Sequence, residues 1–125
     1  MMEEKLLDVG AERAVLAGLL QYGIDAYVAV SDLISVDSFG NKNNKIIYRC
    51  IDDIISNDQV PDIATLLASA EQLNCIDQIS TKQELGYIKS LYDFPVSQEN
   101  IFSFAIQMKK FEFARKIKKL TMKIH

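Results

Sequence analysis

The chain has 125 residues, of which 49% are hydrophobic and 25% are charged, and it contains only five glycines and two prolines. These numbers are typical of one folded domain with its own hydrophobic core, and they exclude a disordered chain and a multi-domain machine. No apolar run approaches the roughly 18 residues of a membrane span, and the opening residues MMEEKLLDVG do not resemble a secretory signal. We therefore expect a soluble cytoplasmic protein without a membrane partner.

The residues that most catalytic and metal sites need are missing or isolated. Cys50 and Cys75 lack the spacing of a zinc site or a redox pair, so we expect two buried thiols. The one histidine, His125, is the last residue, and no Gly-x-x-x-x-Gly-Lys phosphate loop or Gly-x-Gly-x-x-Gly motif occurs. The sequence thus predicts no catalytic residue, no metal site and no cofactor in this chain.

Two further features have a structural and a functional interpretation. The adjacent carboxylates Asp52 and Asp53 could ligate magnesium, but neighbouring helical positions point about 100° apart and no third carboxylate is spaced to join them. We expect both on a solvated helix face. Tyr87 and Tyr92 are predicted to lie at the edge of the core rather than to form a base-stacking platform.

Apolar residues recur at helical spacing through nearly the whole chain, which predicts an all-α fold, a compact orthogonal bundle of about five to six helices. In chain order, the expected helices cover residues 11–22, 24–33, 44–56, 63–73, 82–92 and 98–124. Asp8 and Asp62 are placed to cap the first and fourth helices. Residues 35–44 predict a loop anchored by Phe39, residues 75–79 a short apolar link, and Pro95 a break.

The last helix differs chemically from the rest of the chain. Residues 109–125 carry a net charge of +6, whereas residues 1–108 carry −9. A helix of 27 residues is about 40 Å long, which exceeds the width of a domain of this size, so its C-terminal half should leave the globule. We therefore divide the chain into a globular head, residues 1–96, and a basic amphipathic helix, residues 97–125.

Two sets of side chains on this helix are candidate interaction residues. An apolar row with near-heptad spacing predicts self-association, and it consists of Phe102, Ile106, Phe113, Ile117 and Leu120, with Ile124 continuing the pattern. Phe102 lies nearest the head and is expected to contribute to folding. A basic rim consists of Lys109, Lys110, Arg115, Lys116, Lys118 and Lys119. These residues either contact nucleic-acid phosphates or complement the helix dipole and solvate an exposed face. The acidic pI of about 5.1 favours the second interpretation.

Six segments, taken in order, resemble the N-terminal domain of DnaB-type replicative DNA helicases. Residues 11–20, AERAVLAGLL, are similar to that family's opening signature AEQAVLGALL. The similarity continues through ISVDSF (34–39), NKIIYRCI (44–51), VPDIATLLASAEQL (60–73), ELGYIKSL (84–91) and PVSQENIFSFAI (95–106). It covers most of the chain, and each segment is mainly a core pattern.

The resemblance implies a non-catalytic collar domain whose long helix is the first arm of a truncated helical hairpin. Such domains self-associate into the collar of a hexameric ring and dock the primase and helicase loaders, while ATP and magnesium belong to a separate ATPase domain. DNA contact by the domain itself is then weak or indirect. The alternative is a free-standing nucleic-acid-binding or regulatory protein that uses the Lys-rich helix, and a steep dependence of affinity on salt would distinguish it.

Overall fold

Residues 6–124 are described by a computed structural model, and they form seven α-helices and one short 3₁₀ helix. In chain order these are α1 (Val9–Tyr22), α2 (Ile24–Val30), η1 (Val36–Ser38), α3 (Lys42–Ser56), α4 (Ile63–Gln72), α5 (Ile76–Ile79), α6 (Lys82–Asp93) and α7 (Gln98–Ile124). No strand occurs within residues 6–124, so the prediction of an all-α fold with a long C-terminal helix is confirmed. His125 lies outside the described residues.

Polar side chains begin four of the helices by accepting hydrogen bonds from first-turn N–H groups that have no partner inside the helix. Asp8 caps α1 and Asp62 caps α4, as the sequence predicts, and Thr81 caps α6. Asn41 caps α3 by accepting a 3.0 Å hydrogen bond from the backbone N–H of Asn44. Because the cap is Asn41, α3 begins two residues earlier than predicted.

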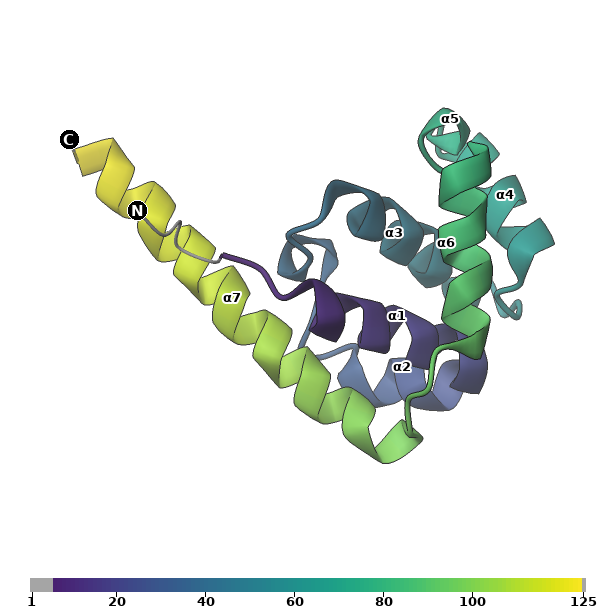
Figure 1. Ribbon diagram of the computed structural model, residues 1–125, viewed down its shortest axis with the longest axis horizontal. Coiled ribbons are helices and arrows are strands. Elements are labelled where there is room, and N and C mark those ends of the chain that lie inside the picture. Colours follow the sequence, from purple (N-terminus) through teal and green to yellow (C-terminus); the bar gives the residue numbers. More distant parts are fainter. Residues whose placement is uncertain (1–5, 125) are drawn as a thin grey trace.

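Helix α1 lies at the centre of the head and packs against α2, α3, α6 and α7 (Figure 1). Its residues 14–20 are all buried, so no face of this segment meets water. Only a segment that is apolar all round can occupy such a position. Gly23 then lets the chain turn directly into α2, because its φ of 66° lies in the left-handed region that favours glycine.

Two short segments differ from the prediction, and one loop agrees with it. Helix α2 ends at Val30, and residues 75–79 contain the single-turn helix α5 instead of an irregular link. A single turn is too short for hydrophobic periodicity to reveal. Phe39 anchors its loop as predicted, since it is fully buried with its ring centroid 4.9 Å from that of Tyr48.

Pro95 separates α6 from α7, as predicted, and α7 then runs along α1 and α2 before it leaves the head (Figure 1). The last buried residue of α7 is Glu112, and residues 116–123 are all exposed. In Figure 1 the yellow C-terminal turns project beyond every helix of the head. This arrangement places two kinds of surface on one helix, a part held by the head and a part surrounded by solvent.

Candidate functional site

Helix α7 presents two parallel stripes of side chains that are one residue out of register, and one residue along a helix is a rotation of about 100°. The first stripe faces the head and consists of Ile101, Ala105, Met108 and Glu112, each at most 2% exposed. The second is the predicted apolar row, and every member of it is exposed. The structure therefore keeps the apolar row together on one side of α7, away from the head.

The head-facing stripe was missed by the sequence analysis. Its spacings of 4, 3 and 4 residues are as helical as those of the apolar row, so periodicity alone cannot decide which stripe packs on the head. Glu112 also gives this stripe a charged member, which the apolar row lacks. The signal that was available is the pairing of the two stripes: Ile101, Ala105 and Glu112 are each followed directly by a residue of the apolar row, and Met108 is followed by Lys109.

A glycine of α1 allows α7 to approach closely. A Cβ atom added at Gly18 would lie only 2.4 Å from Cδ1 of Ile101, which is nearer than real carbon atoms come. Ile101 is itself 1% exposed, so its side chain fills the space that the missing side chain of Gly18 leaves. This contact fixes the start of α7 against α1, and it therefore helps to set the direction in which α7 projects.

A buried carboxylate ends the contact between α7 and the head. Glu112 accepts a 2.6 Å hydrogen bond from the Ser38 hydroxyl and forms ion pairs with Lys116 at 2.7 Å and Lys109 at 3.2 Å. Burial alone would raise the pKa of Glu112, but the hydrogen bonds from Lys116, Ser38 and Lys109 outweigh it and lower the pKa to about 2. The carboxylate is therefore charged at neutral pH and holds α7 to η1.

One further residue of α7 bonds to the head. The Arg115 guanidinium donates one 2.9 Å hydrogen bond to the carbonyl oxygen of Leu6 and another to that of Asp37. Its two partners are neutral carbonyl groups, so these contacts fix the side chain without neutralising its charge. Within residues 6–124, no side chain of α7 beyond Arg115 forms a hydrogen bond or ion pair with the head, because the partners of Lys116 and Thr121 lie on α7 itself.

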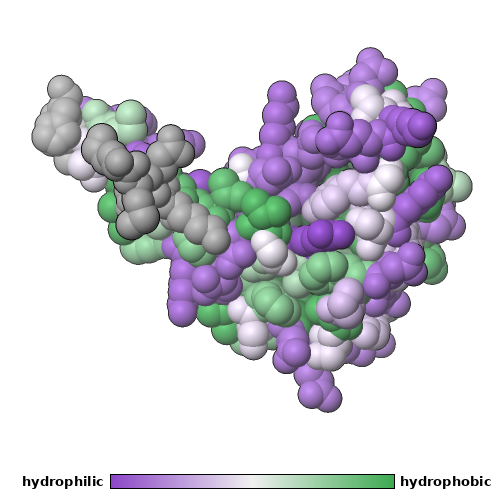
Figure 2. All heavy atoms as spheres, viewed as in Figure 1, coloured by the Kyte–Doolittle hydropathy of each residue, from purple (hydrophilic) through white to green (hydrophobic). Residues whose placement is uncertain are grey.

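The apolar row is the largest exposed hydrophobic feature of α7. Its exposed fractions run from 37% for Ile106 through 49% for Phe102 to 62% for Leu120. In Figure 2, green apolar residues lie beside purple polar ones along the projecting part of α7. Lys109 and Lys110 separate the two parts of the row, Phe102 with Ile106 and Phe113 with Ile117 and Leu120. Exposed apolar residues gathered on one face are typical of an interaction site. Phe102 lies at the head end of the row but is 49% exposed, whereas its neighbour Ile101 is 1% exposed, so the contribution of Phe102 to folding stays a prediction. The Ile124 side chain lies outside the described residues.

The basic rim has members with different roles. Lys109 and Lys116 pair with Glu112, and Arg115 is bound to backbone carbonyl groups of the head. The other three members, all of them exposed, are Lys110, Lys118 and Lys119. Half of the predicted rim therefore has partners within the chain, and only Arg115 among these binds the head.

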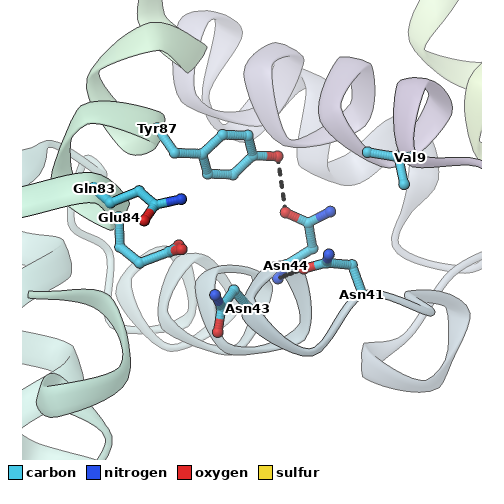
Figure 3. Close-up of a pocket in the computed structure, with 7 residues that line it drawn as sticks. All are labelled: Val9, Asn41, Asn43, Asn44, Gln83, Glu84 and Tyr87. Atoms are coloured by element: carbon cyan, nitrogen blue, oxygen red, sulfur yellow. Dashed lines mark hydrogen bonds between the residues drawn. The ribbon is translucent and has the colours of Figure 1, made fainter. Parts of the chain in front are cut away.

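A second buried carboxylate, that of Glu12 in α1, lies beside the N-terminal end of α3. Glu12 accepts hydrogen bonds from the backbone N–H groups of Gly40 at 2.7 Å and Asn41 at 3.2 Å, and from the Asn44 amide at 3.0 Å. The Tyr87 hydroxyl in turn donates to the Asn44 carbonyl oxygen at 2.8 Å, across a cleft of about 180 Å³ (Figure 3). Because these groups satisfy one another, the network holds α1, α3 and α6 together.

The aspartate pair and the cysteines have structural positions. Asp52 accepts a hydrogen bond from the Tyr27 hydroxyl, and Asp53 accepts one from Ser69 at 2.8 Å. The prediction of a solvated face was therefore wrong, because both half-buried carboxylates face neighbouring helices. Cys50 and Cys75 are buried free thiols, as predicted.

Tyr87 and Tyr92 are half-buried at the edge of the core, as predicted. Within residues 6–124, no group of three or more His, Cys, Asp or Glu side chains is placed to hold a metal ion. No helix in that part of the chain is long and apolar enough to cross a bilayer.

A family model described as the DnaB-like helicase N terminal domain matches residues 4–110. The chain belongs to this family. Among solved structures, this DnaB-like domain is similar to the N-terminal domain of DnaB helicase from Mycobacterium tuberculosis, with a TM-score of 0.85 and 19% identity over 97% of this chain and 84% of that one. At this identity the likeness shows the fold alone. A search of curated proteins finds no match.

The family match covers the head of the DnaB-like domain and the part of α7 that packs against it. It ends at residue 110, so the last head contacts of α7, those of Glu112 and Arg115, lie beyond it. The projecting, cationic part of α7 is therefore a feature of this chain that the match does not describe.

Proposed function

We propose that this chain is the non-catalytic N-terminal collar domain of a hexameric replicative DNA helicase, that it mediates self-association during DNA replication in the cytoplasm, and that it docks the primase or a helicase loader. Membership of the DnaB-like N-terminal domain family supports a helicase domain. In this proposal ATP and magnesium bind to the ATPase domain of the helicase, and this domain acts by binding other proteins.

The apolar row is the observation that carries the proposal of self-association. Phe113 and Ile117 are 57% and 51% exposed on the projecting part of α7, where no other helix of the head covers them. Burying one such side chain stabilises an association by roughly 1.5 to 3 kcal/mol, which is about ten- to a hundredfold in the association constant. A second copy that presents the same row is an occupant of matching chemistry, and symmetric pairing is the commonest way to bury such a face.

Sedimentation velocity at several protein concentrations tests this proposal. We expect the unmodified chain to associate as its concentration rises, and we expect Phe113→Asp, alone or with Ile117→Asp, to lower the apparent mass while the helical circular dichroism is unchanged. Met122→Asp is the matched control, because Met122 is 68% exposed and lies nine residues from Phe113, on the opposite side of α7. An unmodified chain that stays monomeric at millimolar concentration would contradict self-association through this row.

The non-catalytic part of the proposal has a separate test. The sequence contains no Gly-x-x-x-x-Gly-Lys loop to bind nucleotide phosphates, so we expect the purified chain not to hydrolyse ATP. ATP turnover that survives rigorous purification at a constant activity per chain would show that a catalytic site has been overlooked.

A further inference from the structure

The head-facing stripe of α7 changes its chemistry at the point where α7 leaves the head. Against the head it consists of Ile101, Ala105, Met108 and Glu112. Continued at the same helical spacing, it becomes Lys116, Lys119 and Lys123, with Arg115 beside it. The side of α7 that is apolar as far as Met108 is therefore cationic from Lys116 onward, and the change takes place over about two turns, with Glu112 between them.

A cleft of about 250 Å³ lies at this change, between α7 and the loop that leads into α3. Lys45 of α3 forms one wall, and Arg115, Lys116 and Lys119 of α7 form the other. Two carboxylates, Asp37 and Glu112, also line the cleft. Four cationic side chains from two separate helices thus converge on one space in a protein whose net charge is −3.

Part of this positive charge is available to a ligand, because four cations and two carboxylates line the cleft and leave it a net charge of +2. Glu112 is already bound by Lys116, Lys109 and Ser38, so it does not neutralise the other cations. Arg115 is held only by two carbonyl oxygens, and within residues 6–124 neither Lys45 nor Lys119 forms an ion pair.

The backbone at Gly40 permits this placement of the arginine. A Cβ atom there would lie 3.0 Å from Nη1 of Arg115 and 2.6 Å from Cβ of Leu7. Gly40 therefore leaves space for the guanidinium at the wall of the cleft, and the two carbonyl groups hold it there. Because the side chain is already fixed, it loses little conformational entropy when an anion binds.

We propose that this cleft, together with Lys119 and Lys123 beyond it, binds the phosphate groups of a single-stranded nucleic acid. Cations three or four residues apart on one helix face lie about 5–6 Å from each other, so they form a linear array that suits a polyanion better than one phosphate ion. A cleft of this volume accommodates the backbone of one strand, and a positively charged groove that follows the backbone is typical of proteins that bind single strands. This inference goes beyond the proposed function, in which DNA contact is weak or indirect.

Fluorescence anisotropy of a labelled 20-nucleotide oligothymidylate, titrated with the full chain at several salt concentrations, tests the proposal. Four phosphate contacts, from Lys45, Arg115, Lys119 and Lys123, predict a slope of log affinity against log salt near −3, at about −0.7 per contact on single strands. We expect Lys45→Ala and Lys119→Ala each to weaken binding about tenfold at low salt and to reduce that slope by about 0.7.

Lys110→Ala is the matched control, because Lys110 is exposed on the same helix and lies nine residues from Lys119, on the opposite side of α7. It removes the same charge and should change affinity by less than twofold. An equal loss with Lys110→Ala would overturn the site, since the attraction would then be a diffuse effect of net charge. Duplex binding as tight as single-strand binding, or no binding at low salt, would also overturn it.

The same variants separate this proposal from an interface for the acidic head of another copy. Sedimentation velocity of Lys45→Ala and Lys119→Ala should match that of the unmodified chain. If these substitutions change the oligomeric state and leave oligonucleotide binding intact, the cleft binds protein carboxylates and the nucleic-acid proposal is wrong. Self-association through Phe113 is tested by other residues, so the two proposals can fail independently.

Discussion

Ser38 and Glu112 are 74 residues apart in the sequence, yet the Ser38 hydroxyl donates a 2.6 Å hydrogen bond to the Glu112 carboxylate inside the protein. Ser38 ends the short helix η1, and Glu112 is the last buried residue of α7. Their contact therefore lies at the point where α7 passes from the head into solvent. Any surface on the projecting helix, whether apolar or basic, keeps its position relative to the head through this bond and the neighbouring Arg115 contacts.

This contact predicts a specific loss of stability in acid. The pKa of Glu112 is about 2 in the folded protein and near its ordinary value of 4.5 in the unfolded chain, so the folded state binds fewer protons between these values. The stabilisation by Glu112 is fully present above about pH 5 and is lost as the pH falls toward 2. Urea unfolding of the unmodified chain and of Glu112→Gln, measured from pH 7 to pH 2, should give a difference of about 1–3 kcal/mol at pH 7. That difference should shrink in acid, and a difference independent of pH would contradict this role.

Two glycine-to-alanine substitutions should have opposite effects on stability. Gly18→Ala forces a Cβ atom to 2.4 Å from Ile101, so we expect it to destabilise the fold by about 1–3 kcal/mol. Gly86→Ala, in the exposed interior of α6 with no atom within 4 Å, should instead stabilise by about 0.5–1 kcal/mol, because alanine loses less backbone entropy. Chemical denaturation measures both.

A double-mutant cycle identifies the cause of the first effect. If the clash with Ile101 is responsible, Gly18→Ala combined with Ile101→Ala should cost less than the sum of the two single changes by at least about 0.5 kcal/mol. Strict additivity would place the cost elsewhere in α1.

The arrangement of helices was predictable because it depends on local patterns, whereas the roles of α7 depend on packing between distant segments. The cap Asp62, the break at Pro95 and the anchor Phe39 each act within a few residues, and each lies where the sequence places it. The choice between the two stripes of α7 depends on Gly18, more than 80 residues away, which only the folded chain brings against Ile101.

In the candidate site, too, the features that depend on local spacing were predictable and the contacts between distant segments were not. The apolar row and the basic rim are visible as spacings in the sequence, but the bonds of Glu112 and Arg115 are not. Those bonds join α7 to η1 and to residue 6, and no local pattern marks them.

The two cysteines should be unreactive in the folded protein. Burial, together with the neighbouring Cys75, raises the pKa of Cys50 to about 11, so very little of its thiolate exists at neutral pH. We expect a thiol reagent at pH 8 to modify neither Cys50 nor Cys75 until the chain unfolds, with both modified at once in urea. Mass spectrometry over a urea series measures this, and rapid labelling without urea would mean that α3 and α4 open locally.

Neighbouring residues on the two stripes of α7 should separate folding from association. Ile101 is 1% exposed and Phe102 is 49% exposed, although they are adjacent in the sequence. Ile101→Asp places an unpaired charge between α7 and α1, so we expect it to destabilise the fold by more than about 3 kcal/mol or to detach α7 from the head. Phe102→Asp changes a side chain that reaches water, and it should alter the stability of the head by less than about 1 kcal/mol.

The same pair also tests where self-association takes place. If the apolar row is the contact between copies, Phe102→Asp should weaken association about tenfold or more while the urea midpoint stays near that of the unmodified chain. Sedimentation velocity and urea unfolding, followed by circular dichroism, measure the two effects on the same samples. A Phe102→Asp variant that unfolds as easily as Ile101→Asp would show that Phe102 packs on the head. A folded variant with unchanged association would place the contact between copies farther along α7, at Phe113 and beyond, because only the part of the row outside the head would then be used.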